Sequence, residues 1–173
     1  MRTLLGKKGA TSILEILIAL VIAASLITIG MPSFVKLRSH IQLANAASEL
    51  TGEMIKARMM AIKKNTNYTV AFNYTNNTFT VTPQSGTVTT FGTGWLRVDF
   101  YYDSTDPDVP PFAADKVVFH SDGSTDVEAT TTGYKAAVYM KSDTGERRRV
   151  SVIGVTGKVT LERWAGSKWQ SGV

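Results

Sequence analysis

One carboxylate, Glu15, stands in a run from Thr11 to Val35 that carries no other charge. As a helix with a rise of ~1.5 Å per residue, this run would extend roughly 37 Å, enough to cross a hydrocarbon core ~30 Å thick. A carboxylate near the centre of a membrane-spanning helix costs about 2.5–3.5 kcal/mol, and less near the first turn, where the helix dipole favours negative charge. Glu15 is therefore expected either to reach toward the lipid headgroups or to meet a partner cation.

Other reactive side chains are scarce. The chain contains no cysteine and only two histidines, His40 and His120, which excludes disulfides, thiol nucleophiles, thiolate metal centres and histidine-rich metal sites. Nucleophile elbows, phosphate-binding loops and the HExxH and GxGxxG motifs are absent from the sequence. The run His120-Ser121-Asp122 is more typical of a strand end followed by a turn than of a catalytic group. We therefore expect no enzymatic activity and no cofactor.

Three aspartates in a proline-containing segment, Asp103, Asp106 and Asp108, are candidate calcium ligands. Their spacing lacks the loop glycine and the bidentate glutamate of an EF-hand. A solvated acidic loop is the favoured interpretation, and no metal is expected.

Charge is distributed unevenly along the chain. The formal net charge is +5 and the isoelectric point is about 9.5, but three of the basic residues lie among residues 1–10, without which the charge falls to +2. Residues 99–128 are strongly acidic, whereas residues 33–64 and 135–173 are basic. Such patches suit docking against complementary copies or partners.

The hydrophobic pattern predicts one helix from about Ser12 to Lys64. Its first half is apolar on every side, and its second half has an apolar stripe with spacings of three and four residues. The stripe comprises Leu43, Ala47, Leu50, Met54, Ala57 and Ala61, and Ile55, Met59 and Ile62 are expected to widen it. Pro32 is expected to kink this helix because proline removes a backbone donor and clashes with the preceding turn.

After Asn65 the pattern becomes that of short strands. Strands are predicted at Tyr68–Phe72, Thr78–Val81, Trp95–Tyr102, Lys116–His120, Tyr134–Met140, Arg148–Ile153 and Val159–Trp164. The segments Ser85–Gly94 and Asp103–Asp115 are predicted to be loops. The fold class is therefore α+β, a long N-terminal helix whose amphipathic second half packs on an antiparallel, β-rich globular domain.

The N-terminal residues resemble those of type IV pilin-like proteins. The matching segments are Gly9-Ala10, Thr11 to Ile18, and Met31-Pro32-Ser33-Phe34. In that family a prepilin peptidase cleaves before the helix, the new amine is methylated, and glutamate and proline stand at the fifth and twenty-second mature positions. Cleavage between Ala10 and Thr11 places Glu15 and Pro32 at those positions together. The family usually has glycine before the cut and phenylalanine after it, so cleavage after Gly9 is the alternative.

Two later segments resemble the GspH/FimT branch of these proteins, which has the pilin fold. They are Val118–Gly123, with its Asp-Gly turn, and Val152–Val159, in which Lys158 replaces the usual arginine. The resemblance implies a minor pilin or pseudopilin of a type II secretion pseudopilus or a type IV pilus, acting in filament initiation at the tip. It implies a leader at 1–10, a transmembrane and filament-core helix at 11–35, an amphipathic half at 36–64 and a periplasmic domain at 65–173.

The resemblance also implies partners and roles. Glu15 would pair with the amine of Thr11, and Gly30 and Pro32 would allow local melting of the helix during the transfer from bilayer to filament. The implied partners are other major and minor pilins or pseudopilins, the prepilin peptidase, an inner-membrane assembly platform, and membrane lipid before assembly. The implied location is the inner membrane, in a single pass, and then the filament.

Two alternatives stay open. Some members of this branch bind DNA through a basic C-terminal region, and Arg147, Arg148, Arg149 and Lys158 are the candidates here, although alternation along a strand would turn Arg148 away from Arg147 and Arg149. Alternatively, the apolar run is an ordinary signal peptide cleaved near Ala23, and the remainder is a secreted β domain.

Overall fold

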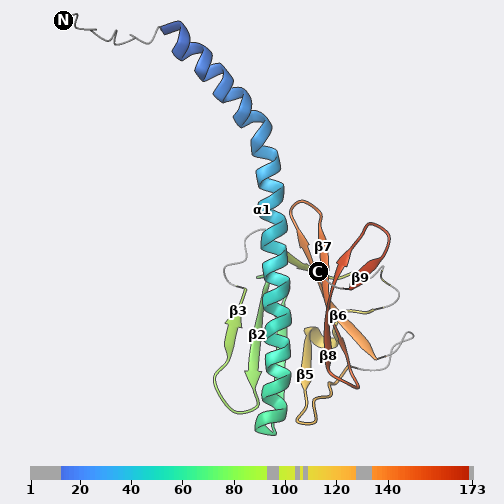
Figure 1. Ribbon diagram of the computed structural model, residues 1–173. Coiled ribbons are helices and arrows are strands. Elements are labelled where there is room, and N and C mark those ends of the chain that lie inside the picture. Colours follow the sequence, from blue (N-terminus) through green and yellow to red (C-terminus); the bar gives the residue numbers. More distant parts are fainter. Residues whose placement is uncertain (1–12, 93–97, 104–105, 107–108, 128–133, 172–173) are drawn as a thin grey trace, which may run out of the picture. The chain divides into compact units, whose positions relative to one another are not determined.

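The computed structural model describes residues 13–92, 98–103, 106, 109–127 and 134–171. The chain divides into two units, residues 1–37 and residues 38–173, which are treated separately below. Helix α1 (Ile13–Lys64) belongs to both (Figure 1).

In the first unit, α1 is apolar on all sides, as predicted. Ser25 and Thr28 donate their hydroxyl hydrogens to the carbonyl oxygens of Val21 and Ala24, both over 2.8 Å, so these hydroxyls are satisfied within the helix. The helical backbone is continuous through Gly30 and Pro32. A kink at Pro32 stays a prediction.

In the second unit, α1 buries one face. The predicted stripe is confirmed, because its six members are all buried: Leu43, Ala47, Leu50, Met54, Ala57 and Ala61. The expectation that Ile55, Met59 and Ile62 widen this buried face is wrong, since all three side chains are exposed. Ile55 and Met59 lie on a part of the helix surface that the sheets leave uncovered, whereas the half-exposed Ile62 lies beside Gly123.

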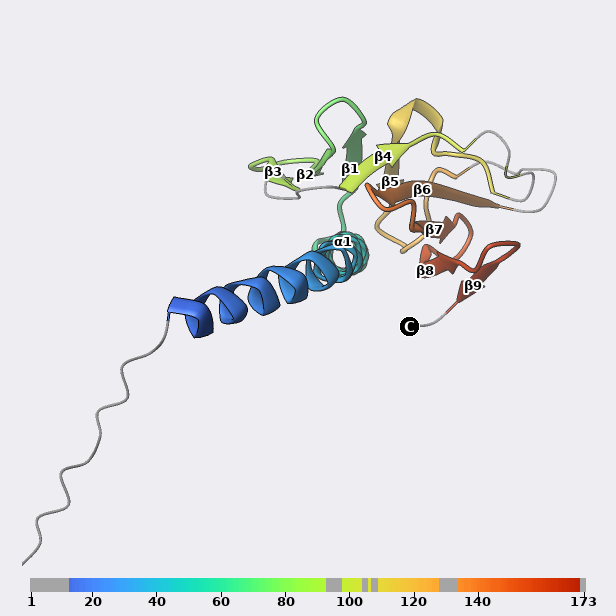
Figure 2. The same ribbon diagram turned by 90° about the horizontal axis from the view of Figure 1, so that it is seen from above.

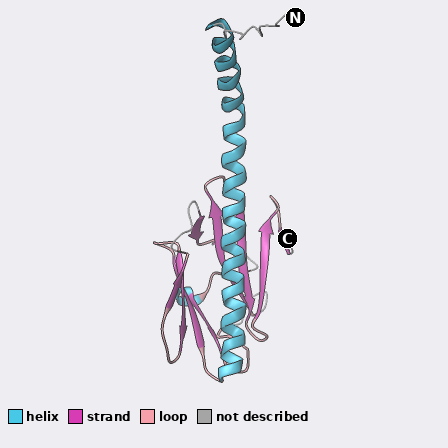
Figure 3. Ribbon diagram, turned by 60° about the vertical axis from the view of Figure 1, so that its left-hand side comes forward, coloured by secondary structure: helices cyan, strands magenta, loops and turns pink. Residues whose placement is uncertain are grey.

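The strands form two antiparallel sheets. The first has the order β3-β2-β1-β5 and contains β1 (Tyr68–Asn73), β2 (Thr78–Pro83), β3 (Thr89–Phe91) and β5 (Lys116–Phe119). The second has the order β4-β6-β7-β8-β9 and contains β4 (Val98–Tyr101), β6 (Lys135–Ser142), β7 (Arg147–Ile153), β8 (Lys158–Trp164) and β9 (Trp169–Ser171). Figures 2 and 3 show the strands gathered along one side of the second half of α1. The predicted α+β class is confirmed.

Where the structure describes them, the strand boundaries follow the predictions to within two residues, and the predicted strand start at Trp95 lies outside the described residues. Two observed strands were not predicted. Strand β3 lies in the segment predicted to be a loop, and β9 was not predicted. Each is three residues long, too short for an alternating pattern, and each is held by pairing with a longer neighbour, β2 or β8. The predicted loop after Asp103 contains a short 3₁₀ helix, η1 (Ala113–Asp115).

One hydrophobic core joins the second half of α1 to both sheets. Aromatic side chains from the first sheet, such as Phe79 and Phe119, and aliphatic ones from the second, such as Val138 and Val150, pack against the buried face of the helix. Burying this face drives helix and sheets together, because each apolar side chain removed from water contributes roughly 1.5–3 kcal/mol.

A corner of close backbone contacts fixes the end of α1 to both sheets. Arg58 Nε donates a hydrogen bond of 3.1 Å to the carbonyl oxygen of Gly123, and Thr125 N donates one of 2.8 Å to the carbonyl oxygen of Gly154. Gly157 has φ of +60°, and a Cβ there would stand 2.1 Å from the Gly123 oxygen. The two segments that resemble the GspH/FimT branch therefore meet at this corner, where only glycine fits at position 157.

Replacing Leu50 by alanine should lower the free energy of unfolding by about 2–5 kcal/mol, because it leaves a cavity between α1 and the sheets. Replacing the exposed Ile55 by alanine is the matched control and should change it by less than about 1 kcal/mol. Urea unfolding followed by tryptophan fluorescence measures both. Equal losses in the two variants would contradict the assigned faces of α1.

Candidate functional site

The predicted processing site, Gly9, Ala10 and Thr11, lies outside the described residues. Glu15 lies in the first turn of α1 as the structure describes it, with its side chain exposed. At that position the unpaired amides of the helix N-terminus favour a negative charge. The geometry therefore leaves the carboxylate accessible to a group brought from outside the helix.

The helix surface that follows Glu15 is apolar and uncovered. An 18-residue window within α1 has a mean hydropathy of 2.6 and no buried residue, and the helix is long and apolar enough to cross a membrane. The exposed large side chains include Ile16, Leu17, Ile18, Leu20, Val21, Ile22, Leu26 and Ile27. A surface of this kind is unfavourable in water and marks contact with lipid or protein.

The arginines proposed for DNA binding do not form a free basic patch. Arg148 is 2% exposed and Arg149 is 5% exposed. The guanidinium carbon of Arg147 lies 6.0 Å from the centre of the Tyr101 ring, and that of Arg149 lies 4.6 Å from the centre of the Trp169 ring. Both rings pack against a small buried cluster that contains Tyr139. Two of the three guanidinium groups are thus withdrawn from solvent, and of the predicted patch only Arg147 and Lys158 are exposed.

Arg149 is at the centre of a buried network of charges. Its Nε atom donates a hydrogen bond of 2.6 Å to Glu162 Oε2, and its Nη1 atom pairs with Asp106. Lys135 Nζ lies 3.3 Å from Glu162 Oε1, so two bases face two acids. Burial acts to raise the pKa of Glu162, but the hydrogen bond and charge of Arg149, together with Lys135, outweigh it and hold that pKa below its ordinary value.

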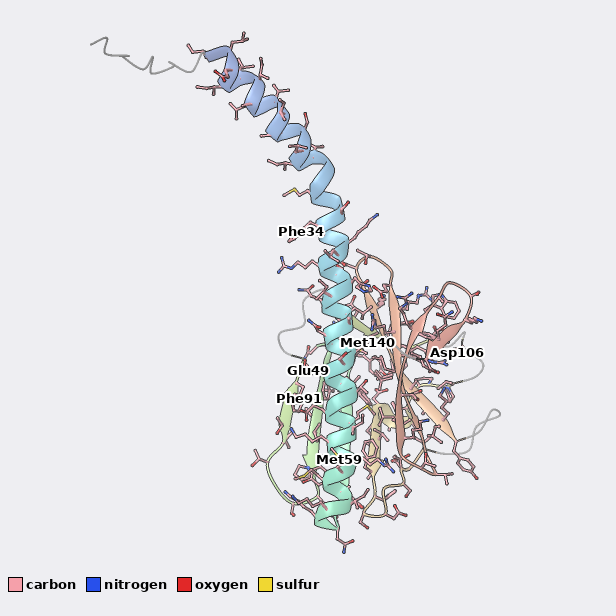
Figure 4. All side chains as sticks on the ribbon, viewed as in Figure 1. Phe34, Glu49, Met59, Phe91, Asp106 and Met140 are labelled. Carbon is pink, nitrogen blue, oxygen red and sulfur yellow. The ribbon has the colours of Figure 1, made fainter. Side chains whose placement is uncertain are left out.

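Two of the three candidate calcium ligands are withdrawn from solvent. Asp106 pairs with Arg149 and accepts a hydrogen bond of 3.1 Å from the Tyr139 hydroxyl, while Asp103 is buried and Asp108 lies outside the described residues. Figure 4 shows Asp106 and Met140 on opposite sides of the second sheet. The favoured interpretation of a solvated acidic loop is wrong for Asp103 and Asp106. Among the described residues, no group of three or more candidate ligands could hold a metal ion.

Contacts between the start of the second unit and the β6–β7 turn were not predicted. His40 Nδ1 lies 2.7 Å from Glu146 Oε2, and Ser39 donates a hydrogen bond to Asp143. Arg148 Nη2 lies 3.6 Å from the other oxygen of Glu146. No local pattern in the sequence indicates that a turn more than a hundred residues away reaches the helix.

The segment His120-Ser121-Asp122 forms the predicted turn. Asp122 Oδ1 accepts hydrogen bonds from the backbone amide and the hydroxyl of Ser124, over 2.9 and 2.6 Å. These bonds lower the pKa of Asp122. The carboxylate therefore stabilises the turn.

The family model for type II transport protein GspH matches residues 46–157, well over half of the chain, from the second half of α1 to the β7–β8 turn. The chain belongs to the GspH family. The match lies outside the N-terminal segment, so it is independent of the alignment of Glu15 and Pro32.

A similar solved structure is that of the minor pseudopilin EpsH from the type 2 secretion system of Vibrio cholerae. It is 12% identical, covers 73% of this chain and 99% of its own, and has a TM-score of 0.46. No curated protein matches the chain. As a GspH-family protein, the chain is a type II secretion pseudopilin, a filament component and not an enzyme. The predicted resemblance is confirmed.

Replacing Glu162 by glutamine should destabilise this pseudopilin by about 3–5 kcal/mol, because it leaves Arg149 buried beside one carboxylate instead of two. In the unaltered chain the contribution of Glu162 is fully present above its unfolded pKa, near 4.5, and is lost as the pH falls through its lower folded pKa. Urea unfolding at pH 7 and at decreasing pH measures both effects.

The control is Glu53→Gln, at the exposed pair in which Lys56 Nζ lies 3.2 Å from Glu53 Oε1. It should change the free energy of unfolding by less than about 1 kcal/mol. A Glu162→Gln variant as stable as this control would contradict the assigned network.

Proposed function

We propose that the chain is made as a precursor, inserted in the inner membrane by residues 11–35, and cleaved by the prepilin peptidase between Ala10 and Thr11. The new Thr11 amine is methylated, and residues 65–173 lie in the periplasm. The assembly platform then transfers the subunit from lipid into a filament with other major and minor pseudopilins. There it acts in initiation at the tip.

The observation that carries this proposal is the surface of α1 between Glu15 and Val35. Its described side chains are exposed, and it is uncharged after its first turn, which fits lipid before assembly and apolar neighbouring helices afterwards. A carboxylate moved into such surroundings must be neutralised. The Thr11 amine is the cation that cleavage would create four residues away, on the same or an adjacent subunit.

The two alternatives have less support. DNA binding loses the guanidinium groups of Arg148 and Arg149, which are buried beside carboxylates. An ordinary signal cleavage near Ala23 would cut through a helix that runs unbroken from Ile13 to Lys64. Neither alternative explains the position of Glu15.

Mass spectrometry of the protein recovered from cells tests the processing step. The mature chain should begin at Thr11 and carry one additional methyl group on its amine. A chain that begins at Ala10 would move the cut by one residue, and Glu15 to the sixth position. An intact N-terminus in the working protein, or one near Ser25, would contradict the proposal.

Replacing Glu15 by alanine should leave the chain in the membrane, because the change removes a costly charge. Its recovery in filaments should fall about tenfold or more, the equivalent of ~1.4 kcal/mol, because the Thr11 amine loses its partner. Quantitative immunoblotting of membrane and filament fractions measures both effects.

Ile16→Ala is a control at the next position, an exposed apolar side chain without charge. It should enter filaments to within about threefold of the unaltered chain. Normal filament entry by Glu15→Ala would overturn the role assigned to this carboxylate.

A further inference from the structure

Two tyrosine rings are stacked at the surface where the β1–β2 turn meets the end of β4. The ring centres of Tyr74 and Tyr102 are 4.2 Å apart, and the ring planes are inclined by 17°. Tyr74 is the inner ring, and its edge contacts Phe100 of β4, with the ring centres 5.9 Å apart. Tyr102 is the outer ring and is 53% exposed. Because Tyr74 covers one face of the Tyr102 ring, the other face is open to solvent.

A carboxylate lies at the edge of this exposed ring. The Tyr102 hydroxyl donates a hydrogen bond to Asp115 Oδ1, and this bond is the main reason that the pKa of Tyr102 is raised to about 12. Asp106, in the same acidic part of the chain, pairs with Arg149. Within the part of the chain that the structure describes, no cation pairs with Asp115 in the same way. An aromatic face and a carboxylate therefore lie side by side.

The backbone that carries Asp115 has an unfavourable conformation. Ala114 has φ of +52° and Asp115 has φ of +54°, in the left-handed region that side chains other than glycine rarely adopt. The buried Phe112 anchors this turn, because its ring stacks on Phe72 and its carbonyl oxygen accepts a hydrogen bond of 3.3 Å from Asp115 N. Strained residues of this kind cluster at sites where a structure positions a side chain for binding. The strain supports a role for this carboxylate in binding.

The chain itself shows which cation suits such an aromatic face. The guanidinium groups of Arg147 and Arg149 lie over the rings of Tyr101 and Trp169. Among the described residues, no cation lies over the ring of Tyr102. A planar guanidinium stacks on an aromatic ring while its N–H groups donate to a neighbouring carboxylate, whereas a lysine ammonium has no plane to stack. The open ring and its carboxylate therefore fit an arginine side chain.

The surrounding charge favours a basic partner. Residues 99–128 hold eight acidic side chains and one basic side chain, Lys116. Asp99 of β4 is exposed beside the β1–β2 turn, where Asn77 Nδ2 donates a hydrogen bond of 3.0 Å to Asp99 Oδ1. Opposite charge on a partner segment promotes its encounter with such a surface, and like charge opposes it.

We propose that Tyr102 and Asp115 bind an arginine side chain from a basic segment of a partner protein. The guanidinium stacks on the open face of the Tyr102 ring and donates to the Asp115 carboxylate. Tyr74 supports the ring from below, and the strained turn positions the carboxylate. This surface lies on the globular unit, so the inference goes beyond the proposed function and does not depend on how the N-terminus is processed.

Binding of short peptides to the full-length chain in detergent tests this site. The probe is a fluorescein-labelled peptide in which arginine alternates with glycine, and two further peptides carry lysine or citrulline in place of arginine. Fluorescence anisotropy should show that the arginine peptide binds about fivefold or more tightly than the lysine peptide, because only the guanidinium can stack. The citrulline peptide, which keeps the shape without the charge, should not bind. Equal binding of the arginine and lysine peptides would overturn the arginine assignment.

Substitutions separate the contributions of the ring and the carboxylate. Tyr102→Leu should weaken binding of the arginine peptide about fivefold, because it removes the aromatic face, whereas Tyr102→Phe keeps that face and should stay within about twofold. Asp115→Asn should weaken binding about tenfold, because it removes the charged acceptor. The matched controls are Tyr134→Leu, at a ring that is 50% exposed, and Glu53→Gln, on α1, and both should stay within about twofold.

Melting temperatures of the same variants distinguish a binding role from a structural one. Unchanged affinity in both Tyr102→Leu and Asp115→Asn would overturn the site, and a lowered melting temperature with unchanged affinity would assign the stack and the turn to stability alone. If Tyr102→Leu does not fold, the near-isosteric Asp115→Asn decides. Displacement of the arginine peptide by tetramethylammonium as readily as by N-acetylarginine amide would indicate a choline-type headgroup and overturn the assigned partner. Each of these outcomes leaves the pseudopilin function intact.

Discussion

The structure and the proposed function both depend on what covers the apolar surface of α1. In the second half of α1, the two sheets cover one face, and the resulting core holds the globular unit together. In the first half, the described residues form a surface with no cover from the chain itself. Apolar burial is the main favourable contribution to association, and exposing this surface to water is unfavourable. The surface must therefore move directly from lipid to contact with protein. In our proposal Glu15 is the one charge that makes this transfer selective, because it requires a matching amine.

The globular unit secures its long segments with charges rather than disulfides. In the segment between β4 and β5, Asp106 forms an ion pair with Arg149 of the second sheet. The Tyr139 hydroxyl donates a hydrogen bond to the same carboxylate. Ser39 and His40 bind the β6–β7 turn in a similar way. Among these contacts, the one with Asp106 uses Arg149, an arginine that makes the chain appear suited to nucleic acid. A positive net charge is therefore a poor guide to the partner of this protein.

Periodic patterns predicted much of the architecture from the sequence. The spacing of Leu43, Ala47, Leu50 and Met54 identified the buried face of α1, because a helix aligns residues three and four apart. It could not show that Ile55, Met59 and Ile62 belong to another face, since composition does not reveal which of two apolar lines a sheet will cover. Alternation placed Arg147 and Arg149 together, but the surroundings of Arg149 depend on Asp106 and Glu162, which no local pattern indicates. The three-residue strands β3 and β9 are likewise stabilised by pairing with β2 and β8, which their own residues do not predict.

The position of Glu15 in an assembled filament is the most direct test of this account. A filament reconstruction at a resolution that shows side chains would locate the carboxylate and the amine of Thr11 together. The account predicts a Glu15 oxygen within about 4 Å of that nitrogen, on the same or an adjacent subunit. A carboxylate that faces solvent or lipid, with the amine bound elsewhere, would contradict it.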